Sequence, residues 1–155
     1  MQLEDFPKVS EYMSKLPPVS PSTPLKDVAK HFKKYKIPIV AVTDNTNVIL
    51  GAIYISTLIK PFIPDFIDYI DNFGFISNLG ALEHKIFSGE MSALFLAQDV
   101  MDTNYPSIEE TDSTVKALFA MHREKVTGLI VKKGNLYRGI IVRCDLLEFL
   151  YGTNK

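Results

Sequence analysis

The stretch Gly139-Ile140-Ile141-Val142-Arg143-Cys144-Asp145-Leu146-Leu147 decides how the chain folds. A glycine opens an apolar run that is typical of a strand, and Asp145 follows six residues later, just before two leucines that begin a helix. The acid therefore lies at a strand-to-helix corner, near backbone N–H groups that have no partner within the helix. The same phrase occurs as Gly51-Ala52-Ile53-Tyr54-Ile55-Ser56-Thr57-Leu58-Ile59, which begins 88 positions earlier (139 − 51 = 88). We infer an internal repeat.

The residues before the first phrase predict the other elements of one copy. Residues 9–13 form a short helical turn, and the proline-rich residues 17–21 leave room for little more than a bridge of strand. Thr23 and Pro24 then suit the N-cap and the first position of a helix. The buried face of that helix is expected at Leu25, Val28, Ala29 and Phe32. Residues 38–42 and 48–55 form a hairpin around the turn 44–47, and a helix begins at 56.

The second copy follows the same order. A short helix at 97–101 leads to a strand at Ile108, and Asp112 or Ser113 caps the next helix. The strands 128–131 and 136–142 form the second hairpin, and the helix 145–151 ends at Gly152. The buried face of the middle helix is expected 90 positions after that of the first copy, at Val115, Leu118, Phe119 and His122. This placement makes His122 a half-buried structural histidine.

Each copy therefore reads β-α-β-β-α over about 50 residues, an α/β (α+β) arrangement. A unit of that size buries too little surface alone, so we expect two copies, 9–60 and 97–151, packed as a pseudo-two-fold pair with clefts where they meet. The insert 61–96 predicts two short helices with a break at Phe73-Gly74. It serves either as a cap over one end of the pair or as a surface for self-association or a partner.

Composition excludes several function classes. The net charge of −1 and the lack of dense basic runs give no footprint for nucleic acid. The acidic start is unlike a targeting peptide, and the longest apolar stretch is too short to insert into a membrane. One cysteine allows no internal disulfide and favours the cytoplasm. The three histidines lack metal-ligand spacing, and no nucleophile or phosphate-loop motif is present, so we expect neither a metal nor catalysis.

With both copies laid out, the chain resembles a tandem cystathionine-β-synthase (CBS) domain pair, or Bateman module. The doubled order of elements and the two closing phrases carry the resemblance. It implies a regulatory, energy-sensing module that needs no cofactor and binds AMP, ADP, ATP or S-adenosylmethionine between the copies. It also implies a homodimer that controls an enzyme or transporter. The alternative is a pair without a ligand that serves as a dimerisation or docking module.

The resemblance places Asp145 on the ribose hydroxyls of the ligand, whereas helix capping alone would also explain this acid. Thr57 holds the matching position in the first copy. Cys144 is expected to be a small buried or half-buried filler. The first cleft is expected to contain Ser22, Thr23, Pro24, Thr127, Gly128, Val142, Arg143, Cys144 and Asp145. The second, weaker cleft is expected to contain Tyr54, Ser56, Thr57, Ser113 and Thr114.

Two departures from the family's pattern weaken the expected grip on a ligand. Ligand-binding members often carry Thr or Ser three residues before the acid, where this chain has Val142 and Tyr54. Members that hold phosphate tightly carry a pair such as His-Arg before the buried strand. The matching pairs here, Tyr35-Lys36 and Lys125-Val126, have one lysine each and no arginine.

Overall fold

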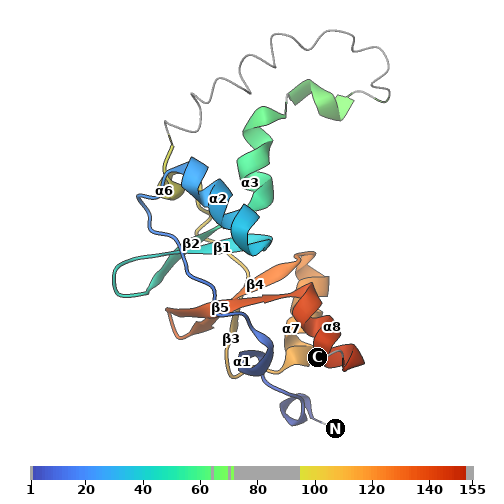
Figure 1. The fold of residues 1–155 in the computed structure, drawn as a ribbon. Helices are drawn as coiled ribbons and strands as arrows, with labels where there is room; N and C mark the ends of the chain where they lie inside the picture. Colours follow the sequence, from blue (N-terminus) through green and yellow to red (C-terminus); the bar gives the residue numbers. More distant parts are fainter. Residues whose placement is uncertain (1, 64, 70, 72–94, 153–155) are drawn as a thin grey trace.

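The computed structural model describes residues 2–63, 65–69, 71 and 95–152 (Figure 1). The first repeat contains the elements α1 (Val9–Tyr12), α2 (Leu25–Tyr35), β1 (Ile39–Thr43), β2 (Ile49–Tyr54) and α3 (Ile55–Ile59). The second repeat contains α6 (Ala97–Val100), β3 (Ser107–Glu109), α7 (Thr114–Glu124), β4 (Gly128–Lys133), β5 (Leu136–Val142) and α8 (Arg143–Tyr151). Short 3-10 helices lie at Leu3–Asp5 (η1), Lys60–Phe62 (η2) and Asp65–Tyr69 (η3).

Two small sheets confirm the predicted α+β class. β1 and β2 form an antiparallel hairpin, and Val19 adds a single parallel bridge to Val42, which is the short strand that the prolines allow. In the second repeat β3 pairs in parallel with β4, and β4 pairs antiparallel with β5. The turn of the first hairpin is closed by the Asp44 carboxylate, which accepts the backbone N–H groups of Thr46 and Val48.

The isolated bridges between distant residues repeat at an offset of 88. Ser14 pairs with Ile140, and its counterpart Asp102 (102 − 14 = 88) pairs with Ala52 (140 − 52 = 88). Val48 pairs with Leu136, its own counterpart in the second repeat (136 − 48 = 88). Equivalent residues pair with each other only at a two-fold axis, so this bridge marks the pseudo-two-fold axis. The bridges therefore follow the expected pseudo-two-fold relation.

The short first helices are exchanged between the repeats. Val9 of α1 is fully buried in a cluster with Met121 and Ile141 of the second repeat. Ala97 of α6 is buried in the other cluster, with Val28 and Ile53 of the first repeat. The core of the second repeat is therefore completed by α1, and the core of the first repeat is completed by α6.

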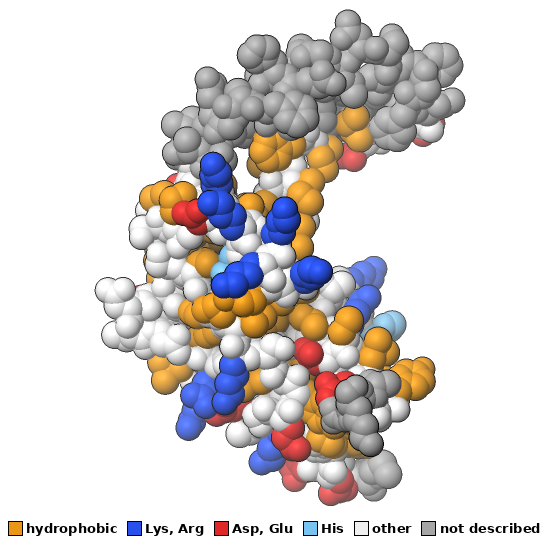
Figure 2. Space-filling model, viewed as in Figure 1, with side chains coloured by type: hydrophobic (Ala, Val, Ile, Leu, Met, Phe, Trp, Pro, Cys, Tyr) orange, Lys and Arg blue, Asp and Glu red, His pale blue; other side chains and the backbone are white. Residues whose placement is uncertain are grey.

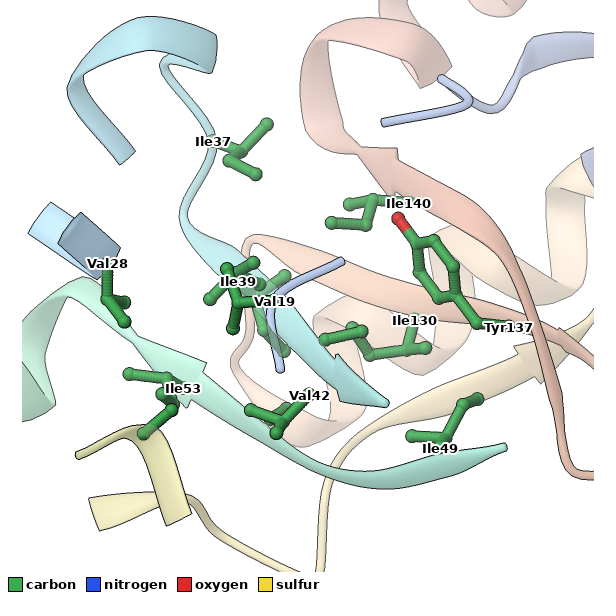
Figure 3. Packing of buried hydrophobic residues seen from close by; sticks show 14 of the residues in the cluster. Val19, Val28, Ile37, Ile39, Val42, Ile49, Ile53, Ile130, Tyr137 and Ile140 are labelled. Atoms are coloured by element: carbon green, nitrogen blue, oxygen red, sulfur yellow. The ribbon is translucent and has the colours of Figure 1, made fainter. Parts of the chain in front are cut away.

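The larger hydrophobic core lies between the two sheets (Figure 3). Ile39 and Val42 of β1 pack in one cluster with Ile130 of β4 and Ile140 of β5. The hydroxyl group of Tyr137, also in this cluster, donates a 2.7 Å hydrogen bond to the carbonyl oxygen of Leu16. Burial raises the pKa of this phenol, so it remains a donor at neutral pH.

The starts of the two long helices differ from each other. Ser113 is the N-cap of α7, as predicted, and its hydroxyl oxygen accepts the N–H of Lys116 at 3.2 Å. The prediction that Thr23 caps α2 is wrong, because the N-cap is Pro24 and the helix begins one residue later. Thr23 instead accepts the N–H of Ser20 at 3.1 Å, within the loop before the helix.

The predicted buried face of α7 is wrong in part: Leu118 packs partly buried against the core and Val115 is half-buried, but Phe119 and His122 are outside it. The residues buried there are Thr114, Ala117 and Met121, whereas Phe119 is 59% exposed and His122 is exposed. The two long helices are related by an offset of 89 (114 − 25 = 89) rather than 90, and this single residue rotates the expected face by about 100°.

Residues 60–71 of the connecting segment are partly described. η2 follows α3 directly and contains Pro61, which stops the regular helix. η3 lies where the first helix of the insert was expected, as a 3-10 helix of five residues. The predicted break at 73–74 and the second predicted helix lie outside the described residues.

Candidate functional site

A cavity of about 280 Å³ lies between the two repeats, beside the strand-to-helix corner of the first one. It is lined by Pro38, Ile39, Tyr54, Ile55, Ser56, Lys125, Val126, Thr127 and Gly128. In each repeat, the first residue of the corner helix is tied to the segment before the buried strand. The N–H of Ile55 donates to the carbonyl oxygen of Pro38, and that of Arg143 donates to Thr127, both at 3.2 Å. These bonds fix the wall of the cavity.

The cavity joins residues that the sequence assigned to different clefts. Tyr54 and Ser56 from the weaker cleft face the space that Thr127 and Gly128 from the stronger cleft also line. Pro38, Ile39 and Ile55 were not predicted. The repeat could have found Ile55, because Ile55 is the counterpart of Arg143 (143 − 55 = 88), which was assigned to the first cleft. The spacing to the bonded residue before the buried strand is 17 in the first repeat (55 − 38) and 16 in the second (143 − 127), so spacing alone did not identify Pro38.

The helix starts that were expected in the clefts lie elsewhere. The carbonyl oxygen of Thr23 accepts the N–H of Ala97 at 2.8 Å, and Pro24 forms a bridge with Leu96, so Ser22, Thr23 and Pro24 lie beside α6. Ser113 and Thr114 are buried, and the N–H of Thr114 donates to the carbonyl oxygen of Pro7. None of these five residues lines the cavity between the repeats.

Asp145 caps α8, as the simpler interpretation of this acid predicts. Its Oδ2 accepts the N–H of Val142 at 2.8 Å, from the third position of the helix back to the N-cap. Burial raises the pKa of Asp145, the hydrogen bond from Val142 opposes this shift, and the nearby Glu148 adds to it. Oδ1 takes no hydrogen bond from the described residues, so the acid can cap the helix and still accept a further donor.

The other corner residues are placed as follows. Thr57 occupies the third position of α3, as Asp145 does in α8, and lines a separate groove with Leu25 and Leu58. Arg143 lines a groove between α7 and α8. The expectation that Cys144 is a buried or half-buried filler is wrong, because its side chain is exposed. It follows Arg143 on the first turn of α8, and the buried residue of that turn is Leu146.

The electrostatic surroundings of the cavity are mixed. Lys125 is the cation among its lining residues, and Glu124 precedes it at the end of α7. Burial raises the pKa of Tyr54, and the negative charges of Asp102 and Glu124 raise it further. The Tyr54 phenol is therefore a neutral group that can donate a hydrogen bond into the cavity at physiological pH.

Two features are absent from the described part of the chain. There, His, Cys, Asp and Glu side chains form no cluster of three or more that could hold a metal ion. The helices in the same part are too short or too polar to cross a bilayer.

Solved structures share this architecture across nearly the whole chain. A CBS domain-containing protein of unknown function from Bacillus anthracis has a TM-score of 0.70 at 17% identity, covering 95% of this chain and 94% of its own. The CBS domain of a membrane protein from Sphaerobacter thermophilus has a TM-score of 0.67 at 23% identity, covering 95% and 89%. CBSX2, solved in complex with AMP, has a TM-score of 0.67 at 16% identity, covering 96% and 98%.

A comparison with curated proteins found no match. The comparison with protein families found the CBS domain twice, at residues 9–63 and 97–152, which together make up most of the chain. Two copies of one domain, the exchanged short helices and the shared core between the sheets agree with this result. The chain therefore belongs to the CBS domain family, as a tandem pair.

Proposed function

We propose that this protein is a non-catalytic regulatory module that binds an adenosyl compound between its repeats and thereby controls a partner protein. The observation that carries the proposal is the cavity between the repeats, because both repeats contribute to its wall and a bound ligand would link their positions. The AMP complex of CBSX2, a protein of the same fold, supports an adenosine nucleotide as the ligand. AMP, ADP, ATP and S-adenosylmethionine are the candidates, and a nucleotide would make the module an energy sensor.

The residues suit an adenosyl group better than a long phosphate chain. Pro38, Ile39 and Val126 offer apolar walls for a base, and the hydroxyl groups of Ser56 and Thr127 offer hydrogen bonds. Asp145 does not line this cavity, and its second carboxylate oxygen, which has no hydrogen-bond donor among the described residues, is proposed to accept ribose hydroxyl groups at the second corner. Of the described residues, one lysine, Lys125, lines the cavity, so each added phosphate gains little from them.

A titration monitored by thermal unfolding tests the proposal. AMP, ADP, ATP and S-adenosylmethionine are each added to the protein, and a ligand at 100 times its Kd should stabilise the fold by about 2.7 kcal/mol. Ser56→Phe, which fills the cavity, should abolish the shift. Ser10→Phe is the control, because Ser10 is also an exposed serine and does not line the cavity. Asp145→Ala separately tests the proposed ribose contact.

The outcome decides between the two functions that the sequence left open. If none of the four compounds shifts the unfolding temperature, or if Ser56→Phe and Ser10→Phe behave alike, the ligand-binding function is wrong. The pair would then act as a dimerisation or docking module without a small molecule.

We also propose that the protein forms a cytoplasmic homodimer through the outer face of α7 and α8. Phe119, Leu147, Leu150 and Tyr151 on these helices are 59%, 50%, 49% and 77% exposed, an apolar surface that the monomer leaves uncovered. Light scattering should give twice the chain mass for the natural protein and the chain mass for Phe119→Glu. An unchanged mass in the variant would exclude this face from the dimer.

A further inference from the structure

One side of α2 is strongly basic. Lys26, Lys30, Lys33 and Lys34 are all exposed and follow the i, i+4, i+7, i+8 spacing of a single helical stripe, on the side away from the buried residues Val28 and Phe32. Figure 2 shows Lys and Arg side chains gathered over α2, with hydrophobic side chains beside them. Asp27 is the one acid in this helix, and its 3.7 Å ion pair with Lys30 is exposed and weak.

The second repeat shows that the fold does not require these lysines. α2 and α7 have the same length, and each ends at a lysine with positive φ, Lys36 and Lys125. At an offset of 89, the positions of the four lysines are occupied in α7 by Val115, Phe119, His122 and Arg123. The basic stripe is therefore a property of the first repeat alone, in a chain whose net charge is −1.

An apolar groove of about 430 Å³ lies beside the stripe, between α2, α3 and α6. Its walls include Leu25, Ala29, Leu58, Phe62 and Val100, and Lys26 stands at its edge. A groove of this size can receive side chains that protrude from another molecule. Binding to a bilayer surface would instead require apolar side chains of this protein to protrude into the lipid. The groove and the stripe run along the same helix, so one ligand can contact both.

We propose that the α2 groove and its lysine stripe dock an acidic amphipathic helix of a partner protein. Apolar side chains of that helix enter the groove, and its carboxylates face the stripe. From Lys26 to Lys34, α2 rises about 12 Å, which is about two helical turns. A partner helix of two turns with acids at i, i+4 and i+7 would therefore match the length of the stripe. The proposal is independent of whether the cleft between the repeats holds a ligand.

Fluorescence anisotropy with a designed peptide tests the proposal on the full chain. The probe is a labelled 16-residue helix with leucines on one face and glutamates on the other, and a second peptide has lysine in place of each glutamate. The glutamate peptide should bind saturably and lose at least tenfold in affinity between low and high salt, whereas the lysine peptide should not bind. Phe62→Ser, which removes a groove wall, should weaken binding as well.

The internal repeat supplies the matched control. Lys33→Glu with Lys34→Glu should reduce peptide affinity at least tenfold, and His122→Glu with Arg123→Glu, at the equivalent positions of α7, should leave it unchanged. Equal effects of the two double variants, or no saturable binding, would overturn the proposal. So would binding to phosphatidylserine vesicles in place of the peptide, or a loss of oligomer mass in the α2 variant. The adenosyl titration should be the same for both double variants, so failure of the cleft function would be seen separately.

Discussion

At the scale of single residues, the repeated glycine of the opening phrase has a steric cause. A Cβ atom built on Gly139 would lie 2.6 Å from the carbonyl oxygen of Ser14, and one on Gly51 would lie 2.9 Å from that of Asp102. Both carbonyl oxygens belong to the segments that follow the exchanged short helices, and both accept a backbone hydrogen bond from the strand beside them. The two glycines therefore allow each repeat to receive the helix of the other.

Gly139→Ala should destabilise the protein, because the added methyl group meets backbone rather than a flexible side chain. We expect a loss of about 1–3 kcal/mol in the free energy of unfolding, measured by urea denaturation. Gly134→Asn is the control, since Gly134 has a φ of 64°, which Asn tolerates, and open space around it. A variant at 139 that is as stable as this control would contradict the close approach.

Asp145→Asn should change how stability depends on pH. The folded pKa of Asp145 is raised above its usual value of 3.8, mainly by burial, so the folded state favours the protonated acid. The resulting stability is fully present below pH 3.8 and is lost as the pH rises through the folded pKa. Asn can still accept the N–H of Val142 but does not titrate. Denaturation at several pH values should therefore show the natural protein losing stability relative to the variant across this window, and a constant difference would contradict the shift.

At the scale of the elements, the sequence predicts type and order well. The structure confirms three features that follow from local chemistry: the hairpins, the end of α8 at Gly152 and the Ser113 cap of α7. The register of α7 could not be predicted, because this helix carries two stripes at helical spacing. Thr114, Ala117 and Met121 face the core, while Val115 and Phe119 look as hydrophobic in sequence but are half-buried and exposed, respectively. Packing against α1, a helix of the other repeat, decides between them.

The site was harder to predict than the elements for a related reason. Asp145 and the two corners follow from the repeated phrase. The cavity, however, pairs a corner of one repeat with residues 125–128 of the other, and this depends on how the two sheets pack. The helix starts at Thr23 and Ser113 are instead occupied by contacts with the segments that carry the exchanged helices.

Thr114→Val should stabilise the protein. Thr114 is fully buried at the start of α7, its hydroxyl oxygen has no hydrogen-bond partner among the described residues, and the equivalent residue in α2 is Leu25. Removing a buried unsatisfied hydroxyl group while keeping the β-branched shape should raise the free energy of unfolding by about 1–3 kcal/mol. Ser113→Ala, one residue before, should lower it by about 0.5–2 kcal/mol through loss of the cap. Thermal and urea denaturation give both values, and a destabilised Thr114→Val would mean that the hydroxyl group has a partner.

At the scale of the whole molecule, the exchange of α1 and α6 makes the repeats interdependent. The smaller core needs Val9 from the first repeat, and the larger core needs Ala97 from the second as well as Ile130 and Ile140 across the sheets. A ligand held between the repeats, or a partner on α2, would therefore act on one cooperative unit rather than on two independent domains.

Separately produced segments 1–63 and 95–155 test this interdependence. Each lacks the short helix that completes its core and loses the packing between the sheets, so neither buries enough apolar surface to offset its conformational entropy. We expect each segment alone to show no cooperative unfolding transition by circular dichroism, and an equimolar mixture to show one. A cooperative transition in either segment alone would mean that the exchanged helices contribute little. Val9→Ala in the natural chain tests the same point with one substitution. It should lower the free energy of unfolding, because the fully buried Val9 of α1 supports the core of the other repeat. Unchanged stability in this variant would also mean that the exchanged helix contributes little.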